Sequence, residues 1–417
     1  MRLPLLPRAA ACLWGAVVFM PVGLNYMAFL LLLATMLVAG DWRERVQRLM
    51  AHPLRWPLAA LVLWQLVVLV IGPHYAETGV NLWHGIRIPL TILLALMLTR
   101  EEAVWAMRGF LGIAFFNIAY TAVFYFILLK FGVMPPMGVL KPMIMLVGNK
   151  SINDALLYTV LGAASAAWAL QRLVEHRPYR AMAGFALTTV TVFIVNWNLP
   201  SRTSLLAMLV VLPLLCVHQW RSHWRGMALA LAAVVVVLGL ALREAPPMVE
   251  QKLAQGVSEI EAARAGAVSE GSWVVRYHMY TVTGRMIADR PLAGWGIGAW
   301  NQIWRERGPA LLANYNMPHN DFLWMGSQTG LPGVAALLAV MLCAVWQAWK
   351  RPDLAGRVAF AATLIALLAS CVNSALRDAQ IGLSLLWVAM VFLRLAREPA
   401  RAWQEVLPRR WRGTATD

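Results

Sequence analysis

A histidine followed by regularly spaced glycines is the feature of this sequence most able to do chemistry. His319 and Asn320 are followed by nine residues, then Gly330, two further residues and Gly333. A neutral imidazole can act as a general base near neutral pH. We predict that Pro318 and His319 open a helix, whose N-terminus disfavours the charged imidazolium. On spacing alone, however, a histidine at a helix start is more commonly a capping or packing residue.

Arginines suited to binding an anion form the second group of candidates. Arg202 lies in Ser201-Arg202-Thr203 at a predicted helix start, where backbone N–H groups and the helix dipole favour a phosphate beside the guanidinium. Arg276 and Arg290 are fourteen residues apart, which returns to nearly the same face of a helix, whereas Arg285 falls on another face. We interpret Arg285 and Arg290 as parts of a solvated helix surface.

The composition shows which elements must position these residues. Hydrophobic residues make up 60% of the 417 residues, charged residues make up 13%, and the mean hydropathy is +0.62. These values exclude a soluble domain and indicate an all-α polytopic membrane protein, with residues 1–417 forming a single integral membrane domain. We predict about twelve transmembrane helices, over residues 9–19, 21–39, 57–71, 86–98, 110–129, 155–170, 182–195, 205–217, 227–240, 334–348, 358–372 and 381–395.

Charge placement orients these helices. If the N-terminus is cytoplasmic, most Arg and Lys residues fall on the cytoplasmic side, and few, among them Arg87, Lys150, Arg202 and Arg377, fall on the other side. This asymmetry predicts that both termini are cytoplasmic, with residues 396–417 as a basic cytoplasmic tail. The net charge of +16 is then an orientation signal and a contact for anionic membrane lipids, and it requires no nucleic acid.

One long extracytoplasmic segment remains, over residues 242–318, between the ninth and tenth predicted helices. Residues 247–270 are predicted to form an amphipathic helix across the mouth of the bundle, and residues 272–289 a second helix that stops before Pro291. The glycine-rich turn at 294–298 lacks the preceding strand and the spacing of a dinucleotide-binding loop. After this segment, Leu331-Pro332 predicts a break that lets a short helix over residues 320–329 re-enter the membrane.

Neither a metal nor another cofactor is expected. The outer segments contain no Asp-x-Asp pair, and Glu259-Ile260-Glu261 is interpreted as the polar face of the amphipathic helix. The four cysteines lie in or beside apolar segments without metal-ligand spacing. Neutralisation of a diphosphate would then fall to Arg and Lys side chains.

The motifs together resemble the bacterial O-antigen ligases and their polymerase relatives. The resemblance rests on the length, the twelve-helix plan with its large loop, Arg202 in Ser-Arg-Thr, Arg276 in the loop helix, and His319-Asn320 with the downstream glycines. It implies a glycosyltransferase C-like fold in the bacterial inner membrane, with the active site facing the periplasm. It also implies transfer of an O-antigen polysaccharide from undecaprenyl pyrophosphate to lipid A–core.

In the mechanism that we expect, His319 is the catalytic base, and Arg202 and Arg276 hold the pyrophosphate. Arg87, Lys150, Arg377 and Asn320 would be supporting residues. The reaction would be metal-independent and would invert the anomeric centre, since no outer carboxylate is placed as a nucleophile.

Three alternatives remain open at this point. An O-antigen polymerase or a protein O-oligosaccharyltransferase of the same superfamily would share parts of the motifs, although the short basic tail favours a ligase over the protein-glycosylating relatives. A secondary transporter of an anionic solute is the alternative of another class, but repeated halves and mid-membrane ionisable residues are not visible in the sequence.

Overall fold

The computed structural model describes residues 5–131, 150–195, 199, 201–222, 224–229, 232 and 247–399, and every regular element in these ranges is a helix. Six helices are long and apolar enough to cross a membrane: α2 (Val22–Ala39), α5 (Thr78–Met97), α6 (Arg100–Phe131), α9 (Arg202–Trp220), α14 (Asp321–Lys350) and α15 (Leu354–Val372). The prediction of an all-α polytopic membrane protein is therefore confirmed.

The remaining helices of the bundle are shorter or bent. They are α1 (Leu5–Val17), α4 (Arg55–Ile71), α7 (Ser151–Val174), α8 (Pro178–Phe193) and α16 (Ala379–Leu395). A short helix that was not predicted, α3 (Trp42–Met50), meets α4 at an angle of 97°. Each predicted apolar segment coincides with a helix except 227–240, which lies largely outside the described residues, as do residues 400–417 of the predicted tail. The number of twelve spans stays a prediction.

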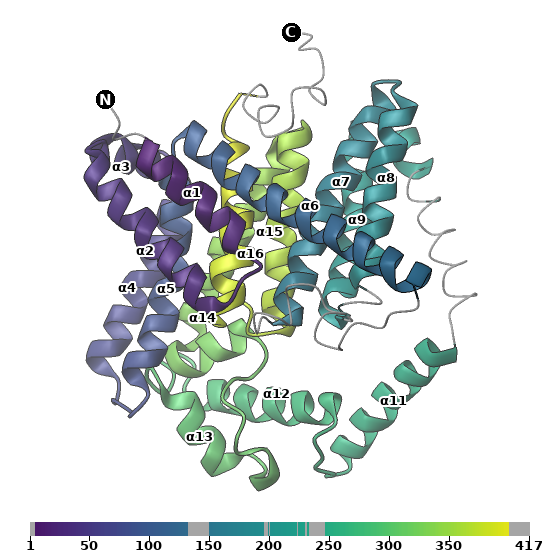
Figure 1. Ribbon diagram of the computed structural model, residues 1–417. Coiled ribbons are helices and arrows are strands. Elements are labelled where there is room, and N and C mark those ends of the chain that lie inside the picture. Colours follow the sequence, from purple (N-terminus) through teal and green to yellow (C-terminus); the bar gives the residue numbers. More distant parts are fainter. Residues whose placement is uncertain are drawn as a thin grey trace.

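Helix α16 forms the centre of the bundle, and almost all of its side chains are buried (Figure 1). The Trp387 ring stacks on Trp14 of α1 at a centroid distance of 3.9 Å. Glycines let α1 approach α6 closely, because a Cβ at Gly15 would lie 2.0 Å from the Ala106 carbonyl oxygen. Small residues at helix crossings allow the close backbone packing that stabilises helix pairs in membranes.

The outer segment forms a helical layer at one end of the bundle (Figure 1). It contains α11 (Pro247–Arg264), α12 (Ser272–Asp289) and α13 (Ala299–Arg307). The second predicted helix has the expected bounds. The first ends six residues early, because Gly266 adopts a left-handed backbone with φ 94° that terminates a helix. Helix α13 was not predicted.

Hydrogen bonds at a break within α14 attach this layer to the bundle. Gly330 has φ 71° and ψ −173°, as the predicted break requires. The break frees the carbonyl groups of residues 327–329 from helical partners. The backbone N–H groups of residues 295 and 296 donate to the first two at 2.9 and 3.0 Å, and the Trp64 indole donates to the third at 2.7 Å. The helix is thus interrupted without leaving these three carbonyl groups unpaired.

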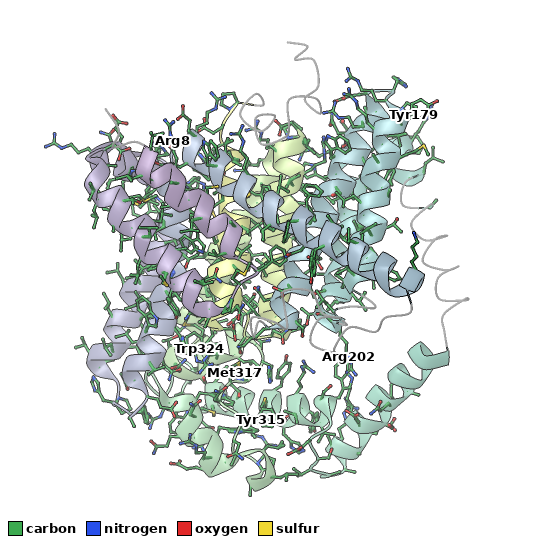
Figure 2. All side chains as sticks on the ribbon, viewed as in Figure 1. Arg8, Tyr179, Arg202, Tyr315, Met317 and Trp324 are labelled. Carbon is green, nitrogen blue, oxygen red and sulfur yellow. The ribbon has the colours of Figure 1, made fainter. Side chains whose placement is uncertain are left out.

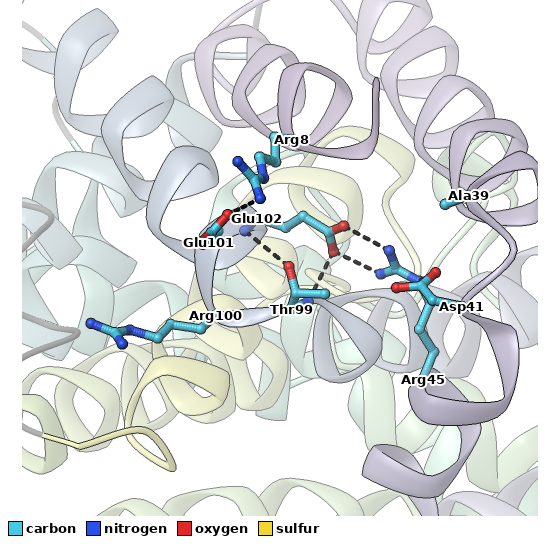
Figure 3. Close-up of a pocket in the computed structure, with 8 residues that line it drawn as sticks. All are labelled: Arg8, Ala39, Asp41, Arg45, Thr99, Arg100, Glu101 and Glu102. Atoms are coloured by element: carbon cyan, nitrogen blue, oxygen red, sulfur yellow. Dashed lines mark hydrogen bonds and ion pairs between the residues drawn. The ribbon is translucent and has the colours of Figure 1, made fainter. Parts of the chain in front are cut away.

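The opposite end of the bundle, the Arg45 end, is held by a buried ion pair (Figure 3). Arg45 on α3 is 1% exposed and donates two 2.7 Å hydrogen bonds to the carboxylate of Glu102 at the start of α6. Its Nε donates to Asp41 at 2.7 Å. Arg8 pairs with Glu101 at the outer edge of the same pocket. Arg45 was expected only as a positive charge that orients the chain, and the structure adds a packing role.

We predict that Glu102→Gln destabilises the protein by about 3 kcal/mol, because loss of one partner leaves a buried guanidinium without its main counter-charge. The measurement is chemical unfolding of the purified protein in mixed micelles. Glu101→Gln is the matched control: its pair with Arg8 is partly exposed, with side-chain exposures of 54% and 33%. Exposed pairs contribute about 1 kcal/mol or less. Equal losses from the two variants would contradict the prediction.

Candidate active site

His319 lies immediately before α14, at the end of the bundle that carries the helical layer. The helix begins at Asp321 and not at Pro318-His319, because Asn320 is the N-cap and its Oδ1 accepts the N–H groups of residues 322 and 323, both at 2.9 Å. His319 adopts a left-handed backbone with φ 52°, which is uncommon for a residue other than glycine. Its carbonyl oxygen accepts a 3.1 Å hydrogen bond from the Tyr280 hydroxyl of α12.

Asn320 therefore supports His319 by holding the backbone that carries it. Besides capping α14, its Nδ2 donates to the Cys371 carbonyl at 2.6 Å, near the end of α15. The Asn320 side chain therefore joins the start of α14 to the end of α15, directly next to His319. The sequence did not predict this geometry, and the supporting role of Asn320 stays a prediction.

Asp321 is the residue that sequence reasoning missed. Its side chain is fully buried, and its carboxylate accepts the backbone N–H groups of Leu376 at 2.7 Å and Arg377 at 2.9 Å. A buried carboxylate requires such donors, because burial without partners is costly. Asp321 thereby fixes the α15–α16 loop next to His319. The available signal was an acidic residue directly after the His-Asn pair, in the first turn of an apolar helix.

The other two basic candidates, Arg87 and Lys150, hold the same loop from outside. Arg87 is 1% exposed and donates to the Leu376 carbonyl at 3.2 Å, to the Arg377 carbonyl, and to the Tyr26 hydroxyl at 2.9 Å. Lys150 forms an ion pair with Asp378. Both side chains are thus engaged with the loop that carries Arg377.

Arg202 and Arg276 meet at a single serine on α12. The Arg202 guanidinium donates to the Ser272 hydroxyl at 3.0 Å, and Arg276 donates to the same hydroxyl at 3.4 Å and to the Ser272 carbonyl at 3.3 Å. Figure 2 shows Arg202 facing the helical layer, with Tyr315 on the same side of the bundle. Two positive charges on different elements therefore lie close together.

The neighbours of Arg202 explain the Ser-Arg-Thr motif. Ser201 caps α9 by accepting the Ser204 N–H at 3.2 Å, and the Thr203 hydroxyl accepts a 2.7 Å hydrogen bond from Asn373. The two flanking side chains are buried, whereas Arg202 is exposed. The motif fixes the helix start and leaves the guanidinium free to reach α12.

The electrostatics of the site keep His319 neutral. Burial, followed by the positive charges of Arg276 and Arg377, lowers the pKa of His319 to about 4. Burial and the charge of Arg202 also lower the pKa of Arg276. The helix N-terminus was expected to keep the imidazole neutral, and the structure adds burial and two guanidinium groups as causes. A neutral imidazole can accept a proton at neutral pH.

Two acidic residues of the outer layer, Glu259 and Asp289, are engaged with other groups of the protein. Glu259 accepts the Trp273 N–H at 3.1 Å, and Asp289 pairs with Arg307 at 2.6 Å. Among the described residues, no three His, Cys, Asp or Glu side chains are grouped as metal ligands would be. Arg290 stacks on Trp295 at 4.0 Å and Arg285 is exposed, in line with their interpretation as surface residues.

We predict that His319 titrates at about 4 and not near 6.5, because the imidazolium would be buried and would place a third positive charge beside Arg276 and Arg377. The check is a pH titration of the ring nitrogens by NMR on ¹⁵N-histidine-labelled protein, with the signal assigned through its absence in His319→Gln. Arg276→Gln should raise this pKa, and Arg285→Gln should leave it unchanged. A titration near 6.5 in the unmodified protein would refute the neutral-base geometry.

Comparison with known proteins supports the motif-based recognition. Residues 199–338 match a family model described as O-antigen ligase, a range that contains Arg202, Arg276, His319 and both glycines of the His-Asn motif. No curated protein matches the chain. The match indicates a function of the O-antigen ligase or polymerase type. Over residues 199–338 the chain thus matches the O-antigen ligase family, and this match bears out the resemblance to the O-antigen ligase/polymerase superfamily that the motifs in this range predicted.

Proposed function

We propose that the protein is an O-antigen ligase, a glycosyltransferase that joins undecaprenyl-pyrophosphate-linked O-antigen polysaccharide to lipid A–core. The observation that carries this proposal is the neutral His319 beside the Arg202 and Arg276 pair, within the residues that match the ligase family. A base and a diphosphate-binding pair are the two groups that a transfer from a polyprenyl diphosphate needs.

The chemical step uses these groups in one displacement. The acceptor hydroxyl gives its proton to His319 while its oxygen forms a bond to the anomeric carbon of the donor. The bond between that carbon and the diphosphate oxygen breaks, and the electron pair leaves with the diphosphate. Arg202 and Arg276 stabilise the charge that develops on the leaving group. A single displacement inverts the anomeric centre.

Donor binding would change the pKa of His319, the proposed base. His319 alone is a weak base, because its pKa is about 4 beside two guanidinium groups. A bound diphosphate brings negative charge to the same place and favours the protonated imidazole. The pKa of His319 would therefore rise toward neutrality when the donor is present, and a base is most effective when its pKa lies near the working pH. Proton transfer would thus be coupled to donor binding.

The location that we propose is the bacterial inner membrane, with the His319 end facing the periplasm and both termini in the cytoplasm. Basic residues of the Arg45 end support it: Arg8, Arg45 and Arg394 contact the same α5–α6 turn. The positive-inside rule predicts such an excess of basic residues at the cytoplasmic end of the bundle. The helical layer then lies over the periplasmic end, and residues 242–318 form the predicted periplasmic loop that caps the site.

We predict that His319→Ala lowers transfer by about 10²- to 10⁴-fold, the usual contribution of a general base, while donor binding is largely kept. Purified protein is incubated in detergent with lipid-linked polysaccharide and lipid A–core, and the product is resolved by gel electrophoresis. His278→Ala is the matched control, because His278 lies on α12 and contacts the Ala267 carbonyl. Near-normal transfer by folded His319→Ala would remove this residue from the mechanism. Turnover in detergent would also exclude the transporter alternative.

We further predict that transfer survives EDTA and does not rise when magnesium or manganese is restored. The reason is electrostatic: Arg202 and Arg276 supply the positive charge that a divalent ion would otherwise bring to the departing diphosphate. The measurement is the initial rate with purified protein, donor and acceptor before and after chelation. Complete loss with EDTA and recovery on adding a divalent ion would overturn the assignment of the diphosphate to these arginines.

Loss of the gene distinguishes a ligase from a polymerase. Without a ligase, long polymer accumulates on the lipid carrier and the core stays bare. Without a polymerase, single units appear on the core. The second outcome would replace the ligase proposal with the polymerase alternative.

A further inference from the structure

Arg377 has a buried guanidinium whose hydrogen-bond donors are unused. The residue is 6% exposed, its Nε has no partner, and its side chain forms no hydrogen bond within the described part of the chain. Buried polar groups of a folded protein are nearly always paired, so an unpaired buried guanidinium needs an explanation. One explanation is a site that completes its hydrogen bonds only when an anion binds.

Three carboxylates interact electrostatically with Arg377, and none of them supplies those bonds. Glu77 accepts a hydrogen bond from Asn301 and pairs with Arg305. Asp321 is occupied by the backbone N–H groups of residues 376 and 377. Asp378 caps α16, where it accepts the N–H groups of residues 380 and 381, and it also pairs with Lys150. All three lie near enough to interact electrostatically with Arg377, but none forms an ion pair with it in the described residues. The charge of Arg377 is partly offset, while its donors stay available.

The backbone of Arg377 is held firmly, so that its position is set before any ligand arrives. Asp321 accepts its N–H, and the buried Arg87 donates to its carbonyl. Its guanidinium lies over the Trp324 ring at 5.9 Å. A preorganised cation loses little conformational entropy when it binds an anion.

Arg377 lies on a different side of the site from the diphosphate pair. Figure 2 shows Trp324, the partner of Arg377, on one side of Met317, and Arg202 on the other side. Arg276 interacts electrostatically with Arg202, and Arg377 interacts electrostatically with Arg87. His319 interacts electrostatically with both Arg276 and Arg377. His319 therefore lies near two separate cationic groups.

We infer that Arg377 binds an anionic group, a phosphate or a carboxylate, on the acceptor sugar lipid, and so sets acceptor specificity. This rests on the proposed function, in which Arg202 and Arg276 hold the donor diphosphate and His319 receives the acceptor proton. An acceptor anchored at Arg377 presents its hydroxyl to His319 from the side opposite the leaving group. A displacement with inversion requires that arrangement.

The test separates the KM of the acceptor from the KM of the donor. We expect Arg377→Gln to raise the acceptor KM by about 10- to 100-fold and to leave the donor KM unchanged, since it removes a charge-assisted, bidentate contact. Arg276→Lys should raise the donor KM and leave the acceptor KM unchanged. Arg285→Gln, at an exposed arginine of α12, is the control for loss of one positive charge and should change neither.

Modified acceptors identify the anion and do not depend on any variant folding. With unmodified protein, we compare lipid A–core, the same acceptor after phosphatase treatment, and the same acceptor after reduction of its carboxyl groups. The treatment that removes the bound anion should raise the KM to that of Arg377→Gln and abolish the difference between the two proteins. If neither treatment changes the acceptor KM of the unmodified protein, the inference is wrong.

Other outcomes are equally decisive. A rise in donor KM for Arg377→Gln would place Arg377 in the diphosphate site, and a loss of kcat with both KM values unchanged would mean that it acts only through His319. Either result overturns the inference and leaves the ligase proposal standing. If the unmodified protein extends lipid-linked units and ignores lipid A–core, the ligase proposal fails. In that case the acceptor is a second lipid-linked chain, whose diphosphate is the anion that Arg377 would bind. Arg377→Gln is then expected to raise the KM of this chain by the same factor.

Discussion

The hydrogen bonds from the α15–α16 loop to the Asp321 carboxylate are the interaction on which the site depends. A fully buried carboxylate is tolerated only where donors surround it, and here the donors are the backbone N–H groups of Leu376 and Arg377. Asp321 directly follows the His319-Asn320 pair, so the same bonds fix the loop against the residue proposed as base. Arg87 and Lys150 then hold the loop from its other side.

The break at Gly330 imposes the second constraint. An interrupted helix exposes carbonyl groups, and in an apolar environment each of them needs a donor. Here the donors come from the glycine-rich turn and from Trp64 on α4. A Cβ at Gly294 would lie 2.5 Å from the Gln328 carbonyl carbon, so the turn can approach this closely only without a side chain. The bonds that pair the carbonyl groups at the break therefore also hold the turn after α12 against α14, while the Tyr280 hydroxyl joins α12 to the His319 carbonyl.

These two constraints produce an unusual balance of charge. Arg202 and Arg276 share a serine, and Arg377 is a further cation near His319. The imidazole stays neutral because burial and the charges of Arg276 and Arg377 disfavour its protonated form. Of the described carboxylates that interact with Arg377, Asp321 and Asp378 are occupied by backbone N–H groups or by Lys150, and Glu77 is occupied by Asn301 and Arg305. An arrangement of cations without matching anions is costly in the free protein, and it favours a ligand that carries negative charge. The proposed diphosphate donor is such a ligand.

The sequence by itself determined the class of the protein, the positions of most helices, the break in α14 and the residues matched by the family model. Hydrophobic periodicity, proline and glycine are local signals, so they can be interpreted without knowing which helices touch. The pairing of Asp321 with Leu376, 55 residues away, and the burial of Arg45 against Glu102 could not be predicted in this way. Only the tertiary structure decided which charges are neutralised and which remain free, because burial and the distance between side chains depend on contacts between distant segments.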